Sequence, residues 1–344
     1  MSTVKELDEA LVLVEQICTS DQIKELLRKR KGDDNIRVSA ENKETLVSKN
    51  LREAVETKVI QIGEIFDLIR ASEESGNQHI FYYRPPKKIA EALSLENVGK
   101  NIWGANWKAK IEDFPTLKLK PDDYRISDFR AYGPTKPKDW ILKIYGQKMV
   151  TFFTGKIEQR ADNTFWKEFK DEPLRIIMMA RWNSPDLLEI RVQRNESRRR
   201  IEEWHKEVWK VLEPALAKTS CDAWALRKLM AKLILQQDKY AKIYSFRDAS
   251  VVDKTGVHAS FQTESDQGNL FASAETKKAV KSYMESESDC SGLTVTWLEN
   301  SKAAPMKDIR TLLGARESNE VIVPGRCIAG DLDYVTDQFR FFSK

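Results

Sequence analysis

The sequence predicts an α+β protein in which an N-terminal α-helical bundle module precedes a larger domain with an antiparallel sheet and flanking helices. Two observations support this fold class. Apolar residues recur at helical spacing over the first 75 residues, and after Gly76 short apolar runs are separated by turn residues. A chain of 344 residues, of which 41% are hydrophobic, is long enough for two domains with separate cores.

Residues 1–75 are expected to form the helical module, with four helices. The first helix begins with Thr3 and Glu6, which fit a capping box. A second helix is expected to start at Ser20 or Asp21. The third and fourth helices follow in the segments SAENKETLVSKNLREAVE and KVIQIGEIFDLIRASEE, each with apolar residues at helical spacing.

Residues 76–139 are expected to form an aromatic and proline-rich connecting segment, with a strand in QHIFYYRPP and a brief helix in KKIAEALSL. Residues 140–344 are expected to form the α+β domain. Its first strands, separated by turn residues, predict an antiparallel meander: DWILKIYG, KMVTFFTGKIEQ, PLRIIMMARW and DLLEIRVQR. Helices are expected at about 196–215, 222–239 and 274–285, and YVTDQFRFF at the end is expected to be a last strand.

The charge of the chain is high but mixed. With 57 basic and 53 acidic residues the net charge is +4, so a surface that binds polyanions must come from local clustering. The four cysteines are far apart and form no C-x-x-C pair, which is typical of a reducing compartment. No signal peptide and no long apolar span is recognisable, so a cytoplasmic location without membrane contact is expected.

A basic cluster follows the leucines of the expected second helix. Arg28, Lys29, Arg30 and Lys31 concentrate positive charge at a helix C-terminus, where the helix dipole favours cations. The same charges, together with Lys43, are suited to phosphate contacts. Three interpretations stay open for this cluster: a solvated helix end, a nucleic-acid site, or a surface for a protein partner.

Residues 20–56 also show a family resemblance. IKELLRKRK followed by ENKETLVSKNLREAV resembles the SAP family of small DNA-binding helical modules, in which a leucine-rich helix ends in basic residues and a second helix starts with a Lys-x-Glu-Leu-Val-like pattern. The loop between the helices is longer and more acidic here, and Glu41-Asn42 replaces the family's small glycine. The resemblance covers roughly a tenth of the chain and implies DNA binding. The matching positions are Leu26, Leu27, Lys43, Leu46, Val47 and Leu51.

A second basic cluster lies in RVQRNESRRRIEEWHKEVWKVL. Arg198, Arg199 and Arg200 fall in the first helical turn, where each opposes the helix dipole by about 0.3–1 kcal/mol. Their glutamate partners at i,i+4 compensate by only about 0.2–0.5 kcal/mol each. An anionic partner explains the arrangement, and Arg191 and Arg194 can join the same patch because Arg forks suit phosphate. The alternative is a basic surface that neighbouring glutamates neutralise.

Catalytic signals are weak. The sequence contains no G-x-S-x-G, P-loop or G-x-G-x-x-G motif, and its three histidines share no ligand spacing, so no catalytic residue, metal site or cofactor is expected. Asp186 and Glu189 only partly resemble a metal-dependent nuclease of the PD-(D/E)xK type, because Arg191 replaces the lysine. The aromatic residues of FYYRPP and NIWGANWKAK either stack on bases or anchor a core.

The sequence therefore predicts a non-enzymatic nucleic-acid-associated protein that contacts phosphates through basic surfaces. The alternative is a protein–protein adaptor or a structural subunit of a larger complex, including a homo-oligomer, and a metal-dependent nuclease is a distant alternative. The predicted contact residues are Arg28, Lys29, Arg30, Lys31, Lys43, Arg191, Arg194, Arg198, Arg199 and Arg200.

Overall fold

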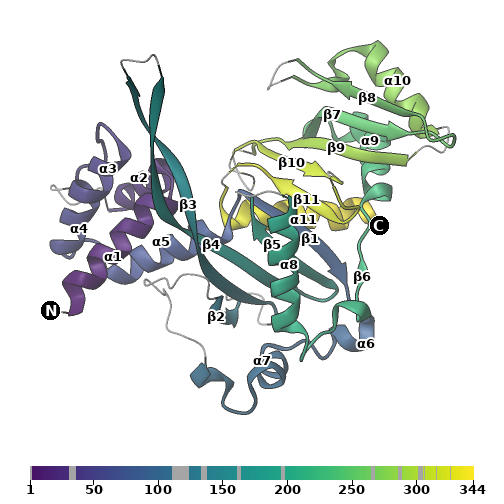
Figure 1. Ribbon diagram of the computed structural model, residues 1–344. Helices are drawn as coiled ribbons and strands as arrows, with labels where there is room; N and C mark the ends of the chain where they lie inside the picture. Colours follow the sequence, from purple (N-terminus) through teal and green to yellow (C-terminus); the bar gives the residue numbers. More distant parts are fainter. Residues whose placement is uncertain are drawn as a thin grey trace.

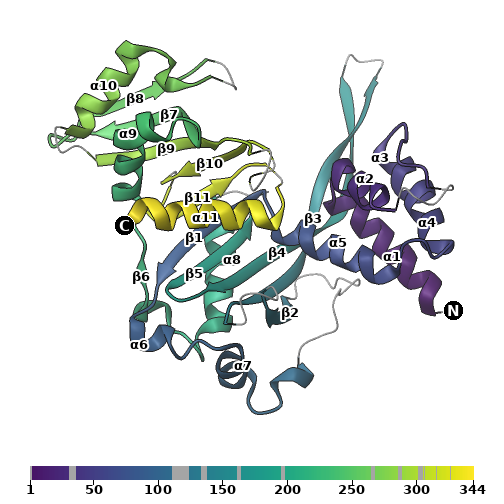
Figure 2. The same cartoon turned by 180° about the vertical axis from the view of Figure 1, so that it is seen from behind.

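The chain has the predicted α+β architecture, with N-terminal helices followed by a large antiparallel sheet and its flanking helices (Figures 1 and 2). The structure is a computed structural model. It describes residues 2–30, 36–110, 124–132, 138–160, 164–194, 198–264, 268–285, 289–300, 305, 307–314, 316–325 and 327–344.

The N-terminal module has a core of its own, made where apolar faces of its helices meet. Thr19 caps the second helix in a reciprocal capping box with Gln22, which places the helix start within a residue of its expected position. The third expected helix contains a π-helical turn, in which buried Asn50 donates hydrogen bonds to the carbonyls of Arg37 and Ser39. The elements are α1 (Ser2–Ile17), α2 (Ser20–Arg28), α3 (Lys43–Thr45), η1 (Leu46–Leu51), α4 (Arg52–Glu56) and α5 (Ile62–Glu74).

One antiparallel sheet runs through the rest of the chain in the order β2-β3-β4-β5-β1-β11-β10-β9-β7-β8, with the short β6 paired to β1. Consecutive strands from β2 to β5 form an antiparallel meander, as expected, but two of its strands differ from the expected ones: DWILKIYG and KMVTFFTGKIEQ form the single strand β3, and β2 comes from the segment expected as a connector. The strands are β1 (Gln78–Arg84), β2 (Arg125–Ala131), β3 (Trp140–Gln159), β4 (Phe165–Asn183), β5 (Leu187–Gln193), β6 (Asp222–Ala223), β7 (Tyr244–Val252), β8 (His258–Gln262), β9 (Asp289–Trp297), β10 (Ile309–Leu313) and β11 (Glu320–Val323).

Strand β1 lies in the middle of this sheet, between β5 and β11. The segment 76–139, expected as a connector, therefore supplies two strands, β1 and β2, and the sheet begins ahead of the boundary predicted at residue 140. The reason is the composition of QHIFYYR, which is apolar on both faces and so suits a strand that is covered on both sides.

Alternate side chains of β1 enter two hydrophobic cores on opposite faces of the sheet. Ile80 and Tyr82 pack with α9 (Arg227–Tyr240) and α11 (Ala329–Ser343), whereas Phe81 and Tyr83 pack with α7 (Leu95–Trp103) and α8 (Arg198–Leu212). Figures 1 and 2 show α8 and α11 on opposite sides of the sheet. The helices and helical turns that cover the sheet are α6 (Lys87–Ala90), α7 (Leu95–Trp103), η2 (Trp107–Lys110), α8 (Arg198–Leu212), η3 (Lys218–Ser220), α9 (Arg227–Tyr240), η4 (Leu270–Ala272), α10 (Ala274–Glu285) and α11 (Ala329–Ser343). Within the described residues, none of the helices has the length and apolar character needed to cross a bilayer.

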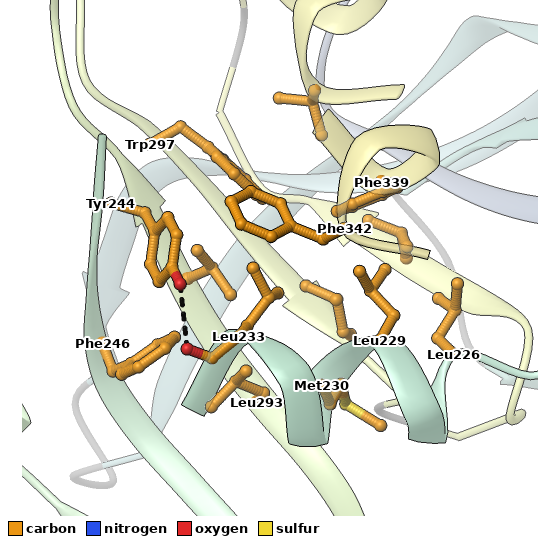
Figure 3. Packing of buried hydrophobic residues seen from close by; sticks show 14 of the residues in the cluster. Leu226, Leu229, Met230, Leu233, Tyr244, Phe246, Leu293, Trp297, Phe339 and Phe342 are labelled. Atoms are coloured by element: carbon orange, nitrogen blue, oxygen red, sulfur yellow. Dashed lines mark hydrogen bonds between the residues drawn. The ribbon is translucent and has the colours of Figure 1, made fainter. Parts of the chain in front are cut away.

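The core beneath α9 is rich in aromatic contacts (Figure 3). The ring of Trp297 lies 5.7 Å from that of Tyr244 and 5.7 Å from that of Phe339, measured between centroids. The hydroxyl of Tyr244 donates a hydrogen bond to the carbonyl of Leu233 at 2.9 Å. This bond satisfies the polar end of a fully buried tyrosine and fixes its ring against α9.

The C-terminal segment is a helix, so the strand expected in YVTDQFRFF is wrong. Leu332, Val335, Phe339 and Phe342 are buried on one face of α11, at helical spacing. The carboxylate of Asp331 accepts a hydrogen bond from the backbone N–H of Ile328, which stabilises the helix start. The aromatic residues of the segment favour a strand locally, but the buried face has the helical period.

Leu233 and Leu235 give a test of this core because both lie on α9, with 0% and 43% of the side chain exposed. Leu233→Ala leaves a cavity beneath Tyr244 and is expected to reduce the free energy of unfolding by about 2–5 kcal/mol. Leu235→Ala is expected to change it by less than about 1 kcal/mol. Urea denaturation followed by circular dichroism measures both values, and equal effects of the two variants would contradict the position of α9.

Candidate functional site

The most exposed apolar surface in the described chain lies on an arm formed by the outer parts of β3 and β4. These strands pair with each other from Trp140↔Trp182 to Gln159↔Phe165, whereas β2 and β5 pair only with their inner parts. Figures 1 and 2 show the resulting two-stranded ribbon rising beyond the body of the protein, beside α2 and α3. We call residues 147–160 and 164–175 the arm.

One face of the arm is apolar. Phe153 and Phe169 are directly paired across the two strands, with ring centroids 5.7 Å apart. Register and alternation place three more apolar side chains on their face, and all five are between 45% and 62% exposed. We call this the apolar face: Met149, Phe153, Ile157, Phe165 and Phe169.

The opposite face of the arm is different in character. Trp166 is exposed there, and the guanidinium of Arg160 lies 3.9 Å from its ring centroid. Lys156 pairs with Glu168 at 3.1 Å, and this hydrogen-bonded lysine keeps the pKa of the Glu168 carboxyl below its usual value. The exposed tryptophan is thus partly covered by an intramolecular cation–π contact.

The charge of the arm is mixed. It contains six basic and four acidic residues, and one of the basic residues, Arg175, is paired with Glu73, so the arm has little net charge with which to attract a polyanion. From the sequence, a strand is expected in KMVTFFTGKIEQ, and no strand is expected in ADNTFWKEFKDE. A signal was present in the alternation of Phe165, Lys167, Phe169 and Asp171, which is typical of a strand with one apolar face.

The base of the arm is fixed to the N-terminal module by buried ion pairs. Glu73, at the end of α5, lies 3.0 Å from the amine of Lys143 on β3 and 2.6 Å from Nε of Arg175 on β4. Neighbouring Glu74 pairs with Lys143 at 2.9 Å and with Arg130 on β2 at 2.6 Å. Burial acts to raise the pKa of the Glu74 carboxyl, but the two cations outweigh it, and the pKa is lowered.

The buried charges continue toward α11. Both Nε and Nη2 of Arg191 donate to the carboxylate of Glu189, at 2.9 and 2.5 Å. Arg181 lies 2.5 Å from Asp333 of α11, and its guanidinium stacks 3.9 Å from the ring centroid of Tyr132. Burial acts to raise the pKa of Glu189, yet Arg191 and Arg181 together lower it to about 2, so this carboxylate is ionised at neutral pH.

The predicted basic cluster of α2 is largely engaged within the module. Lys29 pairs with Glu25 at 3.3 Å and Arg30 with Glu64 at 2.7 Å, while Arg28 is exposed at the end of α2. Lys43 donates a hydrogen bond to the carbonyl of Glu15. Lys31 lies outside the described residues.

The predicted arginines from 191 to 200 are divided between the interior and the surface. Arg191 is only 2% exposed and belongs to the ion pairs described above, so its guanidinium is not accessible to a phosphate. Arg194 is exposed, and so is Arg200, which pairs with Glu203 at 3.4 Å. Arg198 and Arg199 form the first turn of α8, and their side chains lie outside the described set.

The residues considered for catalysis have structural partners. Asp186 pairs with Arg340 at 3.0 Å, and Glu189 is taken up by Arg191, so neither carboxylate is free to ligate a metal. His205 accepts hydrogen bonds from the Tyr83 hydroxyl and the Trp209 indole, and burial lowers its pKa to about 3. Among the described residues no group of three or more His, Cys, Asp or Glu side chains is placed to hold a metal ion.

Of the aromatic residues considered for base stacking, four are buried in the core and Trp103 is half-buried against it. The side chains of Phe81, Tyr82 and Tyr83 are buried, and Trp107 packs 5.4 Å from Phe129 beneath α7. These aromatic residues anchor the sheet, which removes them as a platform for bases.

Comparison with known proteins gives no relative: no family model, no curated protein and no solved structure matches this chain.

Substitution of Glu189 tests how much the buried ion pairs contribute to the stability of the fold. Glu189→Gln leaves Arg181 and Arg191 without their carboxylate, so we expect a loss of about 3–5 kcal/mol in the free energy of unfolding at pH 7. Because the pKa of Glu189 is depressed in the folded state, its contribution is complete above the ordinary value of 4.5 and disappears as the pH falls toward 2. The difference between wild type and variant should therefore shrink over that range.

Urea titrations at a series of pH values measure this difference. Exposed Glu91→Gln is the matched control and should follow the wild type at every pH. A Glu189→Gln protein as stable as the wild type at pH 7 would show that the carboxylate contributes nothing to the folded state.

Proposed function

We propose that this protein is a non-enzymatic assembly subunit or adaptor that binds another protein surface through the apolar face of its arm. One observation carries the proposal. Of the twelve large hydrophobic side chains that are exposed in the described part of the chain, six lie on the arm, and five of these share one face. A contiguous exposed apolar patch on a globular domain marks an interaction surface.

The surroundings of the apolar face support a protein partner. Four polar residues lie on the same face, Thr151, Gln159, Lys167 and Asp171, and they include one charge of each sign. This matches the mixed rim of a protein interface better than the row of basic residues in a nucleic-acid groove. The anchored base of the arm supports the same conclusion. Glu73 of the module forms ion pairs with Lys143 and Arg175. The base of the arm is therefore held in a fixed position, which also fixes the direction in which its exposed aromatic residues point.

The proposal is tested by purifying tagged full-length chain from its native cells at physiological salt. We expect a second polypeptide, either another protein or an untagged copy of this chain, in a fixed stoichiometric ratio. Phe153→Glu combined with Phe169→Glu should abolish the association, because it places charges in the middle of the apolar face. Trp166→Glu, on the opposite face of the same arm, is the matched control. Association that survives the double variant would contradict the proposal.

Nucleic-acid association is the second candidate, and the start of α8 favours it. Helix α8 opens with Arg198, Arg199 and Arg200, has no acidic residue in its first turn, and lies shortly after exposed Arg194. Cations at a helix N-terminus are unfavourable locally, and a phosphate beside them removes the conflict. Exposed Arg28 and Lys29 offer further contacts at the end of α2.

A gel shift at low salt on mixed DNA and RNA tests this candidate. Binding should weaken steeply between about 50 and 200 mM salt, as counterion release requires. Arg194→Glu with Arg200→Glu should weaken it further, whereas Lys87→Glu with Lys88→Glu, which changes the net charge equally on exposed α6, should not. Absence of binding to any strand at low salt would eliminate this candidate.

A further inference from the structure

We infer that the apolar face of the arm is covered by the same face of the arm of a second copy of this chain, related by a two-fold axis. The inference rests on the proposed function, because it names the occupant of the surface proposed there. The pattern of residues along the arm supports it at three points: the order of the apolar side chains, the order of the charges, and the area.

The apolar side chains are ordered so that the face complements itself. The cross-strand pair Phe153 and Phe169 lies midway, with Met149 toward the base and both Ile157 and Phe165 toward the tip. A two-fold axis through the central pair reverses the direction of the second arm. The base of one arm then covers the tip of the other, so that the flexible Met149 packs on the Phe165 end of the second arm.

The charges on this face follow the same symmetry. On β4, Lys167 and Asp171 are the same-face neighbours of Phe169, one toward the tip and one toward the base. Reversal about Phe169 brings Lys167 against Asp171 of the partner subunit, and Asp171 against Lys167 of the partner subunit. Two equivalent ion pairs therefore flank the apolar centre. Within its own chain, Lys167 lies over the Phe153 ring, at 5.9 Å, and Asp171 accepts a hydrogen bond from Thr151 at 2.6 Å.

The area is sufficient for a specific dimer. The five apolar side chains are 45–62% exposed, and each buries about 200 Å² when fully covered, so about 500 Å² of each arm is available from them. Two arms then bury ~1,000 Å², the lower limit for a specific interface, before the polar rim is added. Such an interface suits a dimer that forms at micromolar concentration.

Sedimentation equilibrium of purified full-length chain tests the inference. The wild type should dimerise with a concentration dependence that fits a single dissociation constant. Phe153→Glu with Phe169→Glu should raise that constant at least about 100-fold, and Trp166→Glu should leave it within about 3-fold. The three chains should have the same circular dichroism, because the substituted side chains are exposed.

A charge exchange tests the two-fold register itself. Lys167→Asp alone places four carboxylates in the interface, and Asp171→Lys alone places four amines there, so each variant should dimerise about 10-fold more weakly than the wild type. An equimolar mixture of the two variants should regain wild-type association, because every contact in the mixed dimer then joins opposite charges. A merely structural role for either residue gives no such rescue.

The results separate this inference from the proposed function. If the wild type sediments as a monomer at about 100 µM, well above the micromolar range expected for such an interface, or dimerises unaffected by the Phe153 and Phe169 variants, the inference is overturned. A monomer that still takes a different protein from its native cells, through the arm, leaves the proposed function standing. A monomer with no partner in cells overturns both.

Discussion

The buried ion pairs between the end of α5 and the strands at the base of the arm are the constraint on which the arrangement depends. The side chains of Glu73 and Glu74 lie in the interior, where an unpaired charge costs several kcal/mol. Lys143, Arg175 and Arg130 must therefore meet them. The end of α5 is thus fixed to β2, β3 and β4. These ion pairs therefore set the positions of the module, the sheet and the arm relative to one another.

Strand β1 extends the constraint to the rest of the molecule. It begins four residues after Glu74, in the centre of the sheet, and its alternate residues enter both main cores. Arg191 on the neighbouring β5 donates to the carbonyl of Glu74 at 3.0 Å and pairs with Glu189. The buried ion pairs of Glu74 and Arg191 therefore lie within a few residues of the strand whose side chains enter both main cores. A disturbance at Glu73 or Glu74 displaces the sheet's central strand as well as the base of the arm.

Much of the fold was predictable from the sequence, because apolar periodicity is a local property. The module helices, β5 and α10 follow it closely, whereas the turn expected between DWILKIYG and KMVTFFTGKIEQ is absent, because β3 runs through it as one strand. The burial of Arg191 was not predictable, since the helix end that covers it, where the carbonyl of Glu74 accepts its hydrogen bond, is set by tertiary contacts, and an arginine two residues after a glutamate on a strand also suits a surface. The arm was missed as a site for a related reason. KMVTFFTGKIEQ has the pattern of an ordinary strand and no strand was expected in ADNTFWKEFKDE. Only the pairing shows that these segments form a ribbon and that neither neighbouring strand of the sheet extends as far as Phe153 and Phe169.

The stability of the arm by itself gives a further reason for a partner that covers its apolar face. A two-stranded ribbon without a covering layer is at best marginally stable in water. The buried side chains at the base stabilise the first residue pairs of β3 and β4, but Phe153 and the residues beyond it contribute exposed apolar area and cross-strand contacts worth about 0.2–1 kcal/mol per pair. An uncovered apolar ribbon is moreover prone to aggregation. In the assembly proposed above, a partner that covers the apolar face would remove both difficulties at once.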